Sequence, residues 1–224
     1  DLDALRANFR TVKQRAGRLL LCAVVKADSY GHGAVQCALV FAQEGASWLA
    51  VSCLAEALQL RRSGQTLPIL ILGHVQPTYA AALIRDDITA ACYSLPQAKA
   101  LSEAAQAAGG RVKVHLAVDT GMGRIGFALR TNFDAAIAEA IAACTLPGLT
   151  VMALVPNRRG AEAALAAGVH KLTMPVSASA AHSLANVRKT REAMVEEVRA
   201  VAQLRNAQAP GVLVEVGLST AFGC

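Results

Sequence analysis

Eight short apolar runs alternate with amphipathic segments along this chain of 224 residues, and no other feature constrains its fold as strongly. Short continuous runs of Val, Leu, Ile and Ala are typical of strands buried on both faces. The runs predict strands at 19–26, 48–53, 68–73, 88–93, 112–118, 150–155, 171–177 and 212–218. The segments around them predict helices at 3–15, 34–44, 55–62, 78–85, 96–108, 133–144, 161–167 and 185–205.

The alternation of strands and helices predicts parallel strands joined by right-handed crossovers. Eight such units favour an α/β fold with a single (β/α)8 barrel of the TIM type, formed by residues 1–224 as one domain. An open doubly wound sheet is the alternative, because the pattern alone does not show closure. Pro175 lacks the amide hydrogen of a paired strand, so the seventh strand is expected to be bulged or to begin after it.

Composition narrows the class of protein. Hydrophobic residues make up 54% of the chain and aromatic residues only 4%, which predicts an aliphatic core. No apolar run approaches the roughly 18 residues needed to cross a bilayer, and the first residues lack the layout of a signal peptide. The net charge of +6 is scattered, which argues against a nucleic-acid partner. The six cysteines show no C-x-x-C spacing, which disfavours zinc and indicates a reducing, cytoplasmic location.

A lysine ends the first predicted strand. Lys26 follows the apolar run 19–25, and Gly31 and Gly33 then break the pattern. A lysine at this place must be paired, exposed at the mouth of the fold, or used in chemistry. A buried amine loses its proton readily, which suits it to Schiff-base formation. A lysine that snorkels at a strand end is the plainer alternative.

Residues 26–33 (Lys-Ala-Asp-Ser-Tyr-Gly-His-Gly) closely resemble the pyridoxal-phosphate lysine motif of alanine racemase, with Ser29 in place of the usual alanine. The resemblance implies that Lys26 forms a Schiff base with the cofactor and acts as one of two acid–base groups. It also implies that Tyr30 contacts the cofactor phosphate.

A second segment carries the same resemblance. Residues 114–127 (Val-His-Leu-Ala-Val-Asp-Thr-Gly-Met-Gly-Arg-Ile-Gly-Phe) match the fifth-strand signature of alanine racemase almost throughout. The match implies that Arg124 lies beside the cofactor ring oxygen. Ala117 departs from the family, which often has a lysine there that helps to orient the arginine. The resemblance covers about residues 1–150.

From Ala153 onward the chain resembles hydroxymethylglutaryl-CoA lyase instead. The matching segments are 153–168, 176–182 and 217–224, which correspond to the third, fourth and fifth strand regions of that barrel. The metal-binding Arg-Asp-Gly and His-x-His motifs of the lyase have no counterpart in the sequence. Five racemase-like strands followed by three lyase-like strands complete a barrel, which favours a recombined or designed chimera with parts at 1–150 and 151–224.

The lyase-like part replaces the loops that would hold the cofactor phosphate. By position, Ser177, Ser179, Gly217 and Ser219 are candidates to donate hydrogen bonds to that phosphate, although plain strand-end residues would look the same. In alanine racemase an arginine after the eighth strand contacts the ring nitrogen of the cofactor. The resemblance places Glu215 or Val216 near that position.

The racemase family carries a carboxy-terminal β-domain that supplies a second catalytic tyrosine, and no segment of the 224 residues matches it. We therefore expect a pyridoxal-phosphate-binding barrel with weak or no amino-acid racemase activity, as a monomer or loose homodimer. A scaffold without catalytic function and, with less support, a CoA-thioester lyase are the alternatives.

Overall fold

A computed structural model describes residues 1–16, 20–119, 123–128, 132–155, 157–177, 180, 183–184 and 189–219. Eight parallel strands form one sheet whose spatial order follows the chain order, as the alternation predicted. They are β1 (Cys22–Val24), β2 (Trp48–Val51), β3 (Ile69–Ile71), β4 (Ile88–Cys92), β5 (Val112–Leu116), β8 (Leu149–Leu154), β9 (Lys171–Ser177) and β10 (Leu213–Ser219).

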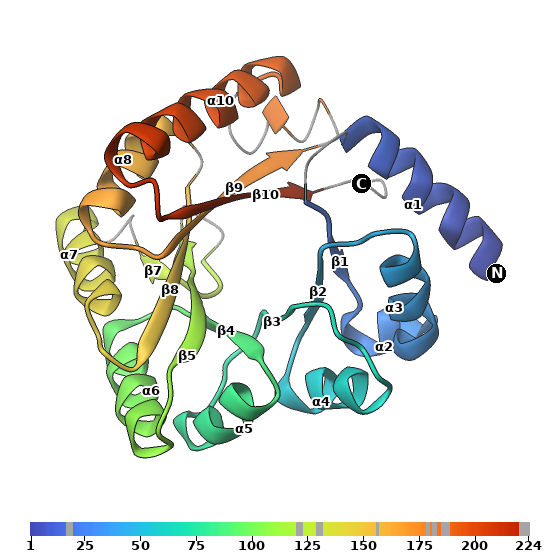
Figure 1. Cartoon of the computed structure of the whole chain (residues 1–224), viewed down its shortest axis with the longest axis horizontal. Coiled ribbons are helices and arrows are strands. Elements are labelled where there is room, and N and C mark those ends of the chain that lie inside the picture. The colour runs from blue at the N-terminus through green and yellow to red at the C-terminus, as the bar shows by residue number, and fades with distance from the viewer. Residues whose placement is uncertain are drawn as a thin grey trace.

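The sheet curls around a common axis, and the crossover helices lie outside it (Figure 1). Hydrogen-bonded pairing runs from β1 to β10, and no pairing within the described ranges joins these two strands to each other. The prediction of eight parallel strands is confirmed, and the sheet is curled and barrel-like. The described residues show no pairing that closes it into the predicted barrel. No helix within the described ranges is both long and apolar enough to cross a bilayer.

Most helices match the predicted segments closely, but no helix was predicted at 26–31, and the helix predicted at 161–167 begins at Arg158. Their bounds are α1 (Leu2–Ala16), α2 (Lys26–Gly31), α3 (Ala34–Gln43), α4 (Leu54–Arg62), the short 3-10 turn η1 (Pro77–Tyr79), α5 (Ala80–Arg85), α6 (Leu95–Ala107), α7 (Phe133–Cys144), α8 (Arg158–Ala166) and α10 (Arg191–Gln208). The last helix was predicted to begin at Ala185, but α10 begins at Arg191. The Thr190 hydroxyl accepts a hydrogen bond from the Ala193 amide and so caps the helix there. Residues 185–188 lie outside the described ranges.

Side chains alternate between the two faces of the curled sheet. One face packs against the helices, and its members include Ala23, Leu49, Ile69 and Val114, which are at most 1% exposed. The other face looks into the curl and carries Trp48 as well as polar residues. The predicted aliphatic core is confirmed, because Leu, Ile or Met make up eleven of the twelve largest fully buried side chains among the described residues.

Pro175 lies within a continuous strand, contrary to the prediction of a bulge or a later start. Strand β9 runs through it and pairs Pro175 with Gly217 of β10. The pairing of β9 with β8 reaches only as far as Thr173, so Pro175 follows the point where β9 loses one neighbour. A proline is tolerated there because no amide hydrogen is required on that side.

The predicted fifth strand is shorter than expected. Strand β5 ends at Leu116, and the Ala117 amide donates to the Cys92 carbonyl oxygen at 2.7 Å. The chain then forms a separate two-stranded parallel pair, β6 (Val118–Asp119) and β7 (Phe127–Ala128), which the sequence did not predict.

Candidate functional site

Lys26 lies two residues after the last residue of β1, at the end of the sheet where all eight parallel strands have their carboxyl termini. Two residues earlier, Val24 lies on the face that looks into the curl and is 38% exposed although it sits in a sheet strand. The Lys26 Nζ lies 5.9 Å from the centre of the Tyr30 ring. Tyr30 itself is 62% exposed. The two residues of the first motif therefore lie together at an open mouth.

The backbone between these two residues is left-handed. The φ angles of residues 27–30 are 51°, 52°, 55° and 55°, and none of the four is glycine. We call residues 27–30 the left-handed turn. Each non-glycine residue in this conformation costs about 1–2 kcal/mol, and consecutive runs are uncommon. Strain of this kind gathers at functional sites, where the surrounding structure fixes it.

Glu56 on α4 holds the beginning of the left-handed turn. Its Oε1 accepts a hydrogen bond from the Ala27 amide at 2.9 Å. Its Oε2 accepts from the Ser52 amide at 2.7 Å and from the Ser52 hydroxyl at 2.8 Å. Partial burial opposes ionisation of Glu56, but the hydrogen bonds from Ser52, Ala27 and Cys53 outweigh it and lower the pKa of the carboxyl.

Asp28 holds the other end of the left-handed turn. Its Oδ1 accepts from the Ala34 amide at 2.7 Å, at the start of α3, and its carbonyl oxygen accepts from the Gly33 amide at 2.9 Å. The Ser29 amide donates to the Val25 carbonyl oxygen at 3.0 Å. A hydrogen bond to a charged group contributes about 1.5–3 kcal/mol, so the two carboxylates offset much of the turn's strain.

Sequence reasoning missed both the left-handed turn and the role of Glu56. Gly31 and Gly33 signalled only a break in the strand pattern, and both have positive φ angles after the turn. Nothing in the spacing of residues 26 and 56 shows that their segments meet. The pairing of β1 with β2 brings them together.

Arg124 lies in the segment between β6 and β7 and is exposed. The segment is shaped by Asp119, whose Oδ1 accepts from the Gly123 amide at 3.1 Å. Gly126 is required nearby because its φ is 142° and an added Cβ would lie 2.4 Å from the Asp119 nitrogen. Within the described ranges, no contact joins Arg124 to Lys26 or Tyr30, so its expected place beside a cofactor ring stays a prediction.

The expected phosphate residues lie at the carboxyl ends of two neighbouring strands. Ser219 of β10 is paired in register with Ser177 of β9, and Gly217 is paired with Pro175. Because the strands are parallel to β1, these positions and Lys26 are at the same end of the sheet. The backbone positions of Ser177, Gly217 and Ser219 therefore agree with a site shared with Lys26. Ser179 lies outside the described residues.

Glu215 does not have the place that the sequence suggested for it. It is the third residue of the seven in β10, 5% exposed, and its carboxylate forms an ion pair with Lys171 of β9. The Lys171 Nζ lies 4.8 Å from the centre of the Trp48 ring. Glu215 therefore belongs to a buried polar cluster inside the curl, well before the strand's carboxyl end.

His115 and Cys22 complete this interior cluster. The His115 ring meets the Trp48 ring edge-on, with the ring centres 5.5 Å apart. Burial, and secondarily the Lys171 charge, lower the pKa of His115 to about 4. Burial, and secondarily the Glu215 charge, raise the pKa of the Cys22 thiol to about 12. Both groups are therefore neutral at pH 7, and the Lys171–Glu215 pair balances its own charge.

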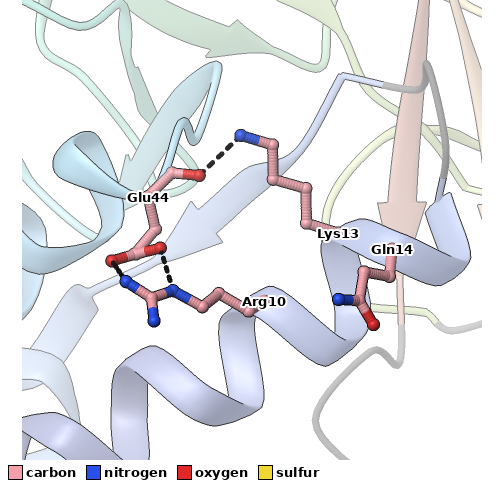
Figure 2. A pocket seen from close by; sticks show the side chains of 4 residues that line it. All are labelled: Arg10, Lys13, Gln14 and Glu44. Atoms are coloured by element: carbon pink, nitrogen blue, oxygen red, sulfur yellow. Dashed lines mark hydrogen bonds and ion pairs between the residues drawn. The ribbon is translucent and has the colours of Figure 1, made fainter.

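A recess of about 390 Å³ on the outer surface is lined by Arg10, Lys13, Gln14 and Glu44 (Figure 2). Arg10 donates two hydrogen bonds to the Glu44 carboxylate, at 2.7 and 2.9 Å. Lys13 donates to the Glu44 carbonyl oxygen at 2.7 Å. The Arg10 and Arg6 hydrogen bonds and charges lower the pKa of Glu44 despite its desolvation. These contacts fasten α1 to the end of α3, and we assign the recess a structural role.

The fold and the site together define a class of protein: a barrel-type α/β domain that presents a lysine amine at the carboxyl end of its first strand. The family model described as the alanine racemase N-terminal domain matches residues 1–221. The chain therefore belongs to the alanine racemase N-terminal domain family.

Individual relatives agree with this assignment. An alanine racemase of Clostridium perfringens is 41% identical over 154 residues, which are 69% of this chain and 39% of the relative. An alanine racemase of Desulforamulus reducens is 43% identical over 152 residues, 67% of this chain and 40% of the relative. The solved alanine racemase of Clostridium difficile 630 superimposes with a TM-score of 0.69 and 26% identity, covering 99% of this chain and 57% of that one.

The chain spans about two-fifths of the length of these curated relatives. Alanine racemases depend on pyridoxal phosphate, which agrees with the cofactor expected from the Lys26 motif.

Proposed function

We propose that residues 1–224 form the cofactor-binding part of a pyridoxal-phosphate-dependent amino-acid racemase, with Lys26 as the residue that binds the cofactor covalently. One observation carries the proposal: in a chain of this family, Lys26 lies at the open carboxyl end of β1, beside Tyr30 and next to a left-handed turn. The donor set suits the group, since an amine and a phenol hydroxyl lie at the same end of the sheet as the carboxyl ends of β9 and β10.

The roles of the other residues follow from their chemistry. Bound pyridoxal phosphate supplies an electron sink for the α-carbon of an amino acid. Lys26 would hold the cofactor and exchange a proton at the Nζ atom. Tyr30 would donate a hydrogen bond to the phosphate, together with the ends of β9 and β10 at Ser177, Gly217 and Ser219. Arg124 would lie beside the ring oxygen.

We propose weak or no racemase activity for residues 1–224 by themselves. Two-base racemisation needs a second acid–base group opposite the lysine. In the family that group is a tyrosine outside the segment matched here. We further propose an amino acid as the small-molecule substrate, a monomer or loose homodimer, and a cytoplasmic location.

Labelling the lysine tests the proposal. Pyridoxal phosphate is added, the adduct is reduced with borohydride, and the labelled peptide is mapped. We expect Lys26 to be labelled well above the other lysines, and Lys26→Ala to lose that label. Lys99→Ala is the matched control, because Lys99 is exposed on the distant helix α6. Equal labelling of Lys26 and the surface lysines would overturn the proposal and favour a scaffold without catalytic function.

The lyase alternative rests on the sequence of β8, β9 and β10. A recombined origin of these strands remains a prediction from the lyase-like segments, and the racemase family model spans the same strands. Metal-dependent cleavage of a CoA thioester, measured with divalent cations added, would favour the lyase. Absence of cleavage together with a labelled Lys26 would support the cofactor-binding function.

A further inference from the structure

We propose that Glu56 is a positioning residue, which holds the left-handed turn in shape and thereby directs Lys26 toward the mouth of the curled sheet. This inference rests on the proposed function of Lys26. Glu56 does not contact the reacting atoms in this scheme, and it acts through the backbone that follows the lysine.

The Glu56 carboxylate binds the backbone immediately next to Lys26. The Ala27 amide belongs to the residue directly after Lys26, and it donates to Glu56 Oε1 at 2.9 Å. Ala27 is also the first residue of the left-handed turn, with a φ of 51°. A bond at this atom therefore fixes the direction in which the chain leaves Lys26.

The other oxygen of Glu56 provides the anchor. Oε2 accepts from both the amide and the hydroxyl of Ser52, which directly follows strand β2. Strands β1 and β2 are paired in register from Cys22 with Trp48 to Val24 with Ala50. The carboxylate thus ties the ends of two neighbouring strands together, and the anchor side is part of the rigid sheet.

The placement on α4 makes the arrangement firm. Glu56 is the third residue of α4, where a carboxylate interacts favourably with the helix dipole. Ala57, the next residue of α4, and Val51, the last residue of β2, are both fully buried. The start of the helix therefore cannot shift freely. Hydrogen bonds to both carboxylate oxygens leave the side chain one well-defined orientation.

Substitutions separate this role from a general contribution to stability. Glu56→Gln keeps one acceptor oxygen and loses the charge, so the hydrogen bonds at one of the two carboxylate oxygens are weakened. Glu56→Ala removes both. Ser52→Ala removes only the hydroxyl contact and leaves the bond to Ala27 in place. Glu103→Ala is the matched control, because Glu103 is an exposed glutamate on the distant helix α6.

The first readout is amide hydrogen exchange of the whole chain without cofactor, resolved at Ala27 and Ser52. We expect exchange at Ala27 to rise about tenfold or more in Glu56→Ala, the effect of losing one charge-assisted hydrogen bond. Glu56→Gln should show a smaller rise, and Ser52→Ala and Glu103→Ala no change at Ala27. A rise spread evenly over all strands would assign Glu56 a merely structural role and overturn the proposal. If Glu56→Ala does not fold, unchanged exchange at both amides in Glu56→Gln overturns it.

The second readout is the absorbance of the lysine–cofactor adduct as a function of pH. We expect Glu56→Ala to shift the pH midpoint of the adduct and to lower its formation about tenfold, with partial rescue in Glu56→Gln. An unchanged midpoint and yield in a variant with raised Ala27 exchange would overturn the link from Glu56 to Lys26. A wild-type chain that forms no adduct at Lys26, while the exchange result holds, would refute the proposed function and leave the Glu56 contact with the turn established.

Discussion

The Lys171 ammonium and the Glu215 carboxylate form an ion pair inside the curled sheet, and the Lys171 Nζ lies 4.8 Å from the centre of the Trp48 ring. The two residues lie on neighbouring strands, because Glu215 of β10 is paired with Thr173 of β9, two residues beyond Lys171. Their side chains are only 16% and 6% exposed. Each charge therefore depends on the other for its stabilisation.

Removing one partner of this pair should be costly. We expect Glu215→Ala to lower the free energy of unfolding by about 3–5 kcal/mol, because an uncompensated ammonium is left in the interior. The double substitution Lys171→Met with Glu215→Leu should lose much less, since no buried charge remains. Urea unfolding of the three proteins measures the difference. A single variant as stable as the wild type would show that the pair is dispensable.

His115 makes stability depend on pH. Its pKa is lowered to about 4 in the folded chain, mainly by burial and then by Lys171, against about 6.5 in the unfolded chain. The unfolded state therefore binds a proton first as the pH falls. Stability should drop by up to about 3 kcal/mol between roughly pH 6.5 and pH 4 through this group.

The variant His115→Gln isolates this contribution. Glutamine does not titrate, so the loss of stability between pH 7 and pH 5 should be smaller than in the wild type. Carboxylates such as Glu197, whose pKa is lowered mainly by a hydrogen bond from Lys189, titrate equally in both proteins and cancel in the comparison. Unfolding curves of both proteins, measured at pH 7 and at pH 5, give the two losses of stability to be compared. Identical pH dependence in both proteins would exclude His115 as the source.

Gly148 should not tolerate a side chain. An added Cβ would lie 2.2 Å from the Ser102 carbonyl oxygen, and the Gly148 amide donates to the Ser102 hydroxyl at 3.0 Å. We expect Gly148→Ala to cost about 1–3 kcal/mol, because α6 and β8 must move apart. Gly211→Ala is the matched control, since an added Cβ there meets nothing within 4 Å. Thermal unfolding compares the two, and equal melting temperatures would contradict the close approach.

Thr190 should stabilise the longest helix through its cap. The hydroxyl accepts from the Ala193 amide at 3.2 Å, and the buried face of α10 begins at Met194, which is fully buried. Thr190→Ala should lower the free energy of unfolding by about 1 kcal/mol. Thr190→Ser should keep most of the stabilisation by the cap, because serine also has a hydroxyl. Urea midpoints of both variants test this, and a serine variant as unstable as the alanine variant would argue against capping.

Local patterns predicted the strands and helices well because each element is short, aliphatic and separated by turns. The apolar run before Lys26 predicted the first strand to within two residues of its observed end at Val24. Met194 and Val201, seven residues apart in the last predicted helix, are both fully buried in α10. Pro175 misled the prediction, because its effect depends on whether a neighbouring strand needs its amide.

The sequence by itself determined the eight parallel strands, the aliphatic core and the lysine at the first strand end. Tertiary structure alone decided what surrounds that lysine. The left-handed turn depends on Glu56, which is 29 residues from the Ala27 amide. The interior pair depends on Glu215 and Lys171, which are distant in sequence and adjacent in the sheet. Contacts of this kind arise only when strand pairing brings separate segments together, so no local pattern contains them.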